Sequence, residues 1–262
     1  MIYICYGITK SASTYLYQMT EEVFRAAGRP VLRLGKPFRK ADSVENYFNF
    51  ITPETLRQIE AVIGEQDIVL KTHGPPIASV AERIAAGDIL ASASIRDPRE
   101  IALSMIDHGA RARRWGNKHF TEFEEASDTL NALDIQTGLF ESWAQIKSVQ
   151  VFRYNDICYD SEAVVAGVAE QIGARVDPQA VLGKFRSRTT IGQFSKGKAL
   201  RYTEMSKPDQ AMFLQRYAPL YQAYEFDTEQ ARKVAEKQKG QALRPAGELI
   251  QQWINFRRRF RI

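Results

Sequence analysis

The chain has 262 residues, of which 44% are hydrophobic and 26% are charged, and this is the composition of one globular domain with a sizeable core. No stretch approaches the roughly 20 apolar residues that a membrane span requires. The formal net charge of +5 does not indicate a nucleic-acid partner, because nine Lys and Arg against three Glu gather in residues 228–262 and leave the rest slightly acidic.

Short apolar runs alternate with longer stretches of helical periodicity, which predicts βαβ units and a parallel sheet. The predicted strands are residues 2–6, 30–34, 67–71, 89–95 and 149–154. The predicted helices are residues 13–27, 53–64, 76–86, 98–107, 134–146, 161–173, 208–223 and 228–239. Residues 108–133 and 184–207 are predicted loops, and loops of that length commonly have a function. We therefore expect a three-layer α/β fold with a central, mainly parallel five-stranded sheet flanked by helices.

The chain contains two cysteines, Cys5 and Cys158, so we expect no disulfide framework and a reducing compartment. The first ten residues contain no basic leader ahead of an apolar core. The expected location is the cytoplasm.

A turn of small residues joins the first predicted strand to the first predicted helix. The turn reads Gly7-Ile8-Thr9-Lys10-Ser11-Ala12-Ser13-Thr14. Backbone N–H groups and the positive end of a helix dipole favour a phosphate at such a turn. A Walker A loop would need Gly directly before Lys10, where this chain has Thr9. An ordinary strand-to-helix turn with a Ser or Thr cap fits this segment equally well.

Two further segments end predicted strands at the same edge of the sheet. The first contains Arg96 and, two helical turns later, Ser104, where open α/β sheets place anionic ligands. The second, Lys71-Thr72-His73, places a histidine for proton transfer near neutral pH. Structural roles remain open for both segments: an Arg–Asp surface pair for the first, and a His bonded to a loop carbonyl for the second.

Taken in order, these three segments resemble the sulfotransferases that use 3′-phosphoadenosine 5′-phosphosulfate (PAPS). The motifs of that family read approximately PKSGTTW, KTH and RNPRDVAVS, and this chain has TKSASTY, KTH and RDPREIALS. Residues 151–157 are similar to its YEDL strand end, and residues 195–197 are similar to its RKG segment. The resemblance spans residues 2 to about 226. It implies a P-loop NTPase-like fold, with a sulfotransferase domain at 1–227 and a basic helical tail at 228–262.

The resemblance implies a role for each matching residue. The 5′-phosphosulfate would be bound by Lys10, Ser11, Ala12, Ser13 and Thr14. The 3′-phosphate would be held by Arg96 and Ser104, with Lys196 and Gly197 from the RKG-like segment. Tyr15 and Tyr154 would contact the adenosine. His73 would act as general base, and Lys10 would neutralise charge on the leaving oxygen. PAPS would be the sulfuryl donor and the 3′,5′-bisphosphate (PAP) its product, with no metal.

Several departures from the family pattern matter. Thr9 replaces a proline, Ala12 a glycine and Tyr15 a tryptophan. Ser195 replaces the arginine of RKG, and Lys196, Arg201 or Arg188 are candidate substitutes on the 3′-phosphate. For the general base, His108 or a carboxylate remains an alternative to His73.

Two other functions remain open. A P-loop kinase of a small molecule would share the loop but transfer phosphoryl with Mg²⁺, and the broken Walker A pattern argues against it. A non-catalytic nucleotide-binding scaffold would not need Lys10 or His73, and the chain has both.

The acceptor is expected to be a small molecule, a glycan or a lipid, bound by residues from 35–52, 108–125 and 184–207. Aromatic and Arg side chains in these segments suit a sugar, a phenol or an anionic acceptor equally well. Residues 248–262 mix apolar and basic residues at near-helical spacing, which indicates either a packed terminal helix or a peripheral contact with a membrane or partner. The sequence does not indicate an oligomeric state.

Overall fold

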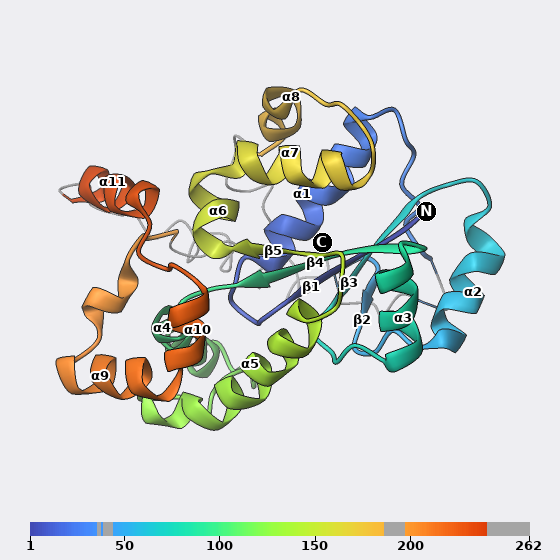
Figure 1. Cartoon of the computed structure of the whole chain (residues 1–262). Coiled ribbons are helices and arrows are strands. Elements are labelled where there is room, and N and C mark those ends of the chain that lie inside the picture. The colour runs from blue at the N-terminus through green and yellow to red at the C-terminus, as the bar shows by residue number, and fades with distance from the viewer. Residues whose placement is uncertain (36–37, 39–43, 186–196, 240–262) are drawn as a thin grey trace.

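The computed structural model describes residues 1–35, 38, 44–185 and 197–239. Its centre is a five-stranded sheet with the strand order β2-β3-β1-β4-β5 (Figure 1), in which every pair of neighbours is parallel. The strands are β1 (Ile2–Gly7), β2 (Tyr47–Phe48), β3 (Ile68–Thr72), β4 (Ile89–Ile95) and β5 (Val149–Arg153). The α/β fold with a five-stranded parallel sheet is therefore confirmed.

Helices cover both faces of this sheet (Figure 1). They are α1 (Ser13–Ala26), α2 (Pro53–Ile63), α3 (Ala78–Ala86), α4 (Pro98–Arg114), α5 (Leu130–Ala144), α6 (Tyr154–Tyr159), α7 (Ser161–Gln171), α8 (Pro178–Gly183), α9 (Lys207–Arg216), α10 (Ala218–Ala223) and α11 (Glu229–Gln238). Two 3-10 helices are η1 (Ser127–Thr129) and η2 (Arg201–Glu204). In the part of the chain that the structure describes, no helix combines the length and apolar character of a membrane span.

The central strand β1 is buried on both faces, and its side chains divide between two cores. Ile4 and Tyr6 point to the core that α2, α3, α4 and α5 cover. Tyr3 and Cys5 point to the opposite core, against α1, α7 and α8. This division follows from the two-residue period of a strand, and a strand buried on both sides reads as a continuous apolar run.

Around the carboxyl end of β1, the connections from neighbouring strands lead to helices on opposite faces of the sheet. The helix after β1 packs on one face, whereas the helices after its neighbours β3 and β4 pack on the other. Open α/β sheets bind ligands at such a position, because the diverging connections leave a crevice between them. The turn at 7–14 therefore lies where the fold places a ligand.

The strand predicted at 30–34 is wrong, and β2 forms the edge of the sheet instead. Residues 30–34 make a single bridge, between Val31 and Asp67. The side chain of Asn46 takes over further pairing: its Oδ1 accepts from the Leu34 amide at 2.9 Å, and its Nδ2 donates to the Leu32 carbonyl at 2.9 Å. Because one amide side chain pairs with these two backbone groups, the segment does not need to pair with a neighbouring strand there.

Helix α4 is longer than predicted and includes residues 108–114, which were expected to be loop. Asp97 caps its start by accepting from the Arg99 amide at 2.9 Å, and Pro98 occupies the first turn. Its last turn contains three arginines, which favour the negative end of the helix dipole. The helix therefore extends along the edge of the sheet into the region expected to bind the acceptor.

Three further elements differ from the prediction. The helix at 208–223 is divided at Tyr217 into α9 and α10, because Pro219 fits only the first turn of a new helix. The strand at 149–154 ends at Arg153, and Tyr154 begins α6. Helix α8 was not predicted. Helix α11 matches the predicted 228–239 helix and contacts α6, so the first part of the basic tail packs on the body.

Candidate active site at the carboxyl edge of the sheet

The loop of residues 8–12, which follows β1, is held close to β4 and α1. A Cβ atom on Gly7 would lie 2.2 Å from the Ser94 Oγ and 2.5 Å from the Ser13 Cβ, so the close approach requires glycine. Lys10 and Ala12 have left-handed backbones, with φ of 71° and 64°. Ala12 also precedes α1 without a side-chain cap, which leaves the first N–H groups of the helix available to a ligand.

Ser11 uses its side chain to hold this loop rather than to face solvent. Its hydroxyl donates to the Ile8 carbonyl at 2.6 Å and lies 2.8 Å from the Ser94 hydroxyl. Since the single proton of Ser11 is already donated, Ser94 is the donor between the two hydroxyls. Ser13 and Thr14, the other predicted phosphosulfate residues, are buried at the start of α1. The loop is thus fixed by internal bonds before any ligand binds.

Lys10 points from this loop toward the C-terminal half of α4. Its Nζ lies 2.5 Å from the Nδ1 of His108 and 4.9 Å from the centre of the Phe120 ring. Burial, and then the charges of Arg111 and Arg96, lower the pKa of Lys10 to about 7. Burial and the Lys10 charge lower the pKa of His108 to about 4. While Lys10 is protonated it donates to His108, whose remaining ring proton is then on Nε2.

His73 follows β3 and is fixed against the end of β1. Its Nδ1 lies 2.5 Å from the carbonyl oxygen of Gly7, which can only accept, so Nδ1 carries the ring proton. Its Nε2 therefore has the lone pair and lies 3.2 Å from the Lys71 Nζ. Burial, and then the charge of Lys71, lower the pKa of His73 to about 4. Nδ1 thus donates to the Gly7 carbonyl, and Nε2 is an unprotonated base at neutral pH.

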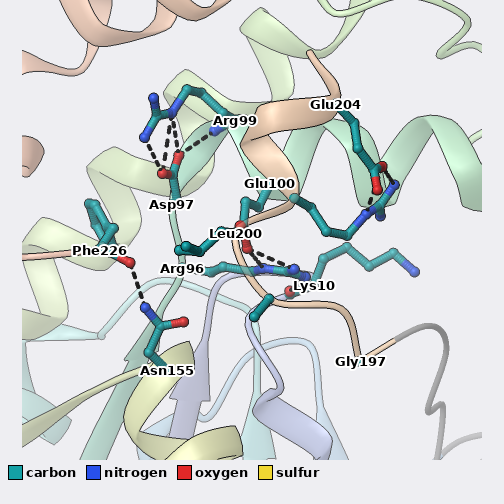
Figure 2. Close-up of polar contacts among 12 residues, drawn as sticks. Lys10, Arg96, Asp97, Arg99, Glu100, Asn155, Gly197, Leu200, Glu204 and Phe226 are labelled. Atoms are coloured by element: carbon teal, nitrogen blue, oxygen red, sulfur yellow. Dashed lines mark hydrogen bonds and ion pairs between the residues drawn. The ribbon is translucent and has the colours of Figure 1, made fainter. Parts of the chain in front are cut away.

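Arg96 lies on the other side of the loop, buried between three partners. Its Nε and one terminal nitrogen both lie 2.9 Å from the Glu100 carboxylate, and the other terminal nitrogen donates to the Lys10 carbonyl at 3.4 Å (Figure 2). The guanidinium also stacks on the Tyr154 ring, 3.8 Å from its centre. The structure therefore brings together Lys10, Arg96 and Tyr154 around one loop.

Other predicted residues lie near this cluster without bonding to it. Ser104 is half-buried on α4, two turns beyond Arg96, and forms no hydrogen bond to Arg96 or Lys10. Tyr15 meets the Phe185 ring edge-on at 5.1 Å. The carbonyl of Gly197 accepts from Gln238 on α11 at 3.1 Å. Lys196 and Arg188 lie outside the described residues.

Arg201, the third candidate to replace the missing arginine, is already bonded to two acids. It is buried, and its terminal nitrogens lie 2.9 Å from the Asp107 carboxylate and 2.8 Å from the Glu204 carboxylate. These partners compensate its charge and anchor η2 to α4. Within the described ranges, no group of three or more His, Cys, Asp or Glu residues is arranged to hold a metal ion.

Helix α5 positions both loops of the site, and the sequence did not indicate this. The Gln136 Oε1 accepts from the Thr9 amide at 2.8 Å. The Trp143 Nε1 donates to the Gly74 carbonyl at 3.0 Å, in the turn after His73. The two side chains are two helical turns apart and so lie on one face of α5. A sequence signal exists, since Gln136 is a polar residue between the apolar core residues Leu133 and Phe140.

No family model matches the chain, and no curated protein matches it. Solved structures do match. The mouse sulfotransferase SULT7A1, complexed with PAP, has a TM-score of 0.50 at 10% identity over 90% of this chain and 88% of that chain. Retinol dehydratase, in complex with androsterone and the inactive cofactor PAP, has a TM-score of 0.50 at 15% identity over 94% of this chain and 82% of that chain. At these identities the likeness establishes the fold, and the chain has the P-loop NTPase-like sulfotransferase fold.

Proposed function

We propose that this chain transfers a sulfuryl group from PAPS to a hydroxyl or an amine of an acceptor. The observation that carries the proposal is the convergence of Lys10, His73 and Arg96 at one edge of a sheet with the sulfotransferase fold. Each of the three comes from a different strand end, and each stands in a motif that resembles the family. Both similar structures were determined with PAP bound.

The residues of the site fit an adenosine 3′-phosphate 5′-phosphosulfate. Lys10 lies in the loop that leads to the uncapped start of α1, and Arg96 donates to the Lys10 carbonyl. Backbone N–H groups at such a helix start favour phosphate. The Tyr159 hydroxyl is buried and has no hydrogen-bond partner among the described residues, and its ring meets the ring of Tyr154, on which Arg96 stacks. A 3′-phosphate beside Arg96 would give that hydroxyl an acceptor, since an unpaired buried donor is costly.

Bound PAPS supplies an activated sulfuryl group whose leaving group is the 5′-phosphate of PAP. In the transfer, a bond forms between the acceptor oxygen or nitrogen and sulfur, and the bond from sulfur to the bridging oxygen breaks with its electron pair staying on that oxygen. Lys10 would stabilise the charge that develops there, which is the moment at which an electrostatic contact accelerates a reaction. An anion beside Lys10 also raises its lowered pKa and keeps it cationic.

His73 would accept the acceptor proton on Nε2. The bond from Nδ1 to the Gly7 carbonyl orients the ring and fixes the tautomer, as a general base requires. His108 is a poorer candidate for the base, because its Nδ1 already contacts the Lys10 ammonium. Lys71 would have to share or leave Nε2 when an acceptor binds.

Transfer of label from [³⁵S]PAPS to a mixed set of phenol, alcohol, sugar and amine acceptors tests the proposal. We expect labelled product with at least one acceptor class, and about 10²- to 10³-fold slower labelling with the Lys10→Met variant. ATP with Mg²⁺ serves as the competing donor. Phosphoryl transfer from ATP without sulfuryl transfer from PAPS would contradict the proposal.

A further inference from the structure

One face of α4 runs alongside the candidate site from Arg96 past Lys10. Glu100, Ser104, His108 and Arg111 lie within about 80° of one another at 100° per residue. The face begins beside Arg96, which Glu100 binds, and reaches Lys10 at His108. Arg111 follows about 4.5 Å farther along the helix axis. The face therefore continues past Lys10, away from Arg96.

Arg111 places a positive charge on this far side that no described residue compensates through an ion pair. Its side chain is half-buried, and its charge contributes to lowering the pKa of both Lys10 and His108. Among the described residues it forms no ion pair and no side-chain hydrogen bond. Asp107, the carboxylate that acts on Lys10, is bonded to Arg201. Two neighbouring cations in a partly desolvated site repel each other unless an anion lies between or beside them.

A neighbouring arginine of the same helix has a different role. Arg113 donates to the Thr121 carbonyl at 2.6 Å and so holds the loop of residues 117–123 on α4. A Cβ atom on Gly109 would lie 2.0 Å from the Phe120 carbonyl oxygen, so this docking requires glycine in the helix. The Phe120 ring is consequently held 5.0 Å from the His108 ring and over Lys10. The far side of the site thus combines an aromatic wall with the Arg111 charge.

We propose that Arg111 binds an anionic group of the acceptor, so that the substrate is a hydroxyl or amine compound that also carries a carboxylate, phosphate or sulfate. The inference rests on the proposed function, in which PAPS extends between Arg96 and Lys10 and its negative charge compensates those two side chains. Arg111 lies past Lys10 on the side away from Arg96, so an acceptor that attacks sulfur in line with the leaving oxygen would approach from its side. Its guanidinium suits a planar or tetrahedral oxyanion through two parallel hydrogen bonds.

Matched acid and amide pairs test this inference by binding as well as by turnover. The probes are 4-hydroxyphenylacetate, glucuronate and 12-hydroxydodecanoate, each compared with its primary amide. Binding is measured by calorimetry on protein saturated with PAP, and turnover is measured with PAPS. In at least one pair we expect the carboxylate to bind about tenfold or more tightly than the amide.

The variants distinguish this inference from the function on which it rests. Arg111→Ala should abolish the preference for the carboxylate, Arg111→Lys should keep part of it, and Arg114→Ala, with the same change of charge on the same helix, should keep all of it. PAP affinity should stay within about threefold in all three variants. The inference is wrong if PAP binds but no carboxylate is preferred, if the preference survives in Arg111→Ala, or if that variant instead loses PAP. Failure of the unaltered protein to bind PAP would contradict the proposed function itself.

Discussion

The backbone amide of Thr9 donates a hydrogen bond of 2.8 Å to the Oε1 of Gln136, which lies 127 residues later in the chain. The motif that this loop resembles has proline at the position of Thr9, and proline has no amide hydrogen. The substitution therefore adds a donor to a partly buried loop, and Gln136 satisfies that donor. Thr9 and Gln136 therefore form one compensated pair.

Gln136→Ala should destabilise the loop, because removing the partner of a buried donor costs about 1–3 kcal/mol. We expect PAP to bind more weakly in calorimetry and the protein to unfold at lower denaturant concentration. Thr9→Pro in the same background removes the orphaned donor and should restore most of the PAP affinity. Gln136→Glu keeps an acceptor and is the matched control. A double variant that is no better than Gln136→Ala would show that Gln136 acts otherwise than through Thr9.

Lys10→Met keeps the length of the side chain and removes its charge. In the proposed mechanism Lys10 stabilises the charge that develops on the leaving oxygen, so we expect single-turnover transfer from PAPS to slow about 10²- to 10³-fold. PAP affinity should fall much less, because Arg96 and the α1 N–H groups remain. Lys118→Met, at an exposed position, is the control. Loss of PAP affinity equal to the loss of rate would assign Lys10 to ground-state binding.

His73→Gln should slow sulfuryl transfer by about 10²- to 10⁴-fold at neutral pH, because it removes the lone pair on Nε2. PAP should still bind. His108→Gln and His119→Gln are the comparisons, and each should keep the rate within about tenfold. The opposite result, a slow His108 variant beside an active His73 variant, would move the base to His108.

The three histidines can be followed individually by NMR because the chain has no others. Burial, and then the charge of Lys71, hold the pKa of His73 at about 4, so the ring is neutral above about pH 5. An anion beside Lys10 favours the protonated imidazole, and PAP should therefore raise the pKa of His73. The His73→Gln spectrum assigns the signal. A pKa that is unchanged when PAP saturates the protein would place the phosphate away from this cluster.

The sequence predicted the central strands because β1, β3 and β4 are short apolar runs whose order and spacing follow the βαβ rule. It also brought Lys10, His73 and Arg96 to one edge, since parallel strands end together. Residues 30–34 were wrongly predicted to form a strand, because the side chain of Asn46 replaces part of a backbone ladder there and no local pattern reveals this. The edge strand β2 was missed because it has only two residues.

The contribution of α5 was missed for a related reason. Gln136 and Trp143 bond to backbone groups that are 127 and 69 residues away in the chain. The periodicity of a sequence shows only which face of a helix is apolar, so it does not predict such contacts. The charge of Arg111 was visible in the sequence, but the absence of a partner among the described residues became visible only once α4 was in place beside Lys10.

Calorimetric titration with PAP tests the account most directly, with Arg96→Ala and ATP–Mg²⁺ as comparisons. Arg96 is buried beside the loop, stacks on Tyr154 and pairs with Glu100, so its removal would leave the proposed phosphate site with less positive charge. We predict micromolar binding of PAP, weakened about tenfold or more in Arg96→Ala and not matched by ATP–Mg²⁺. Binding of ATP–Mg²⁺ without PAP, or PAP binding that is indifferent to Arg96, would contradict the account.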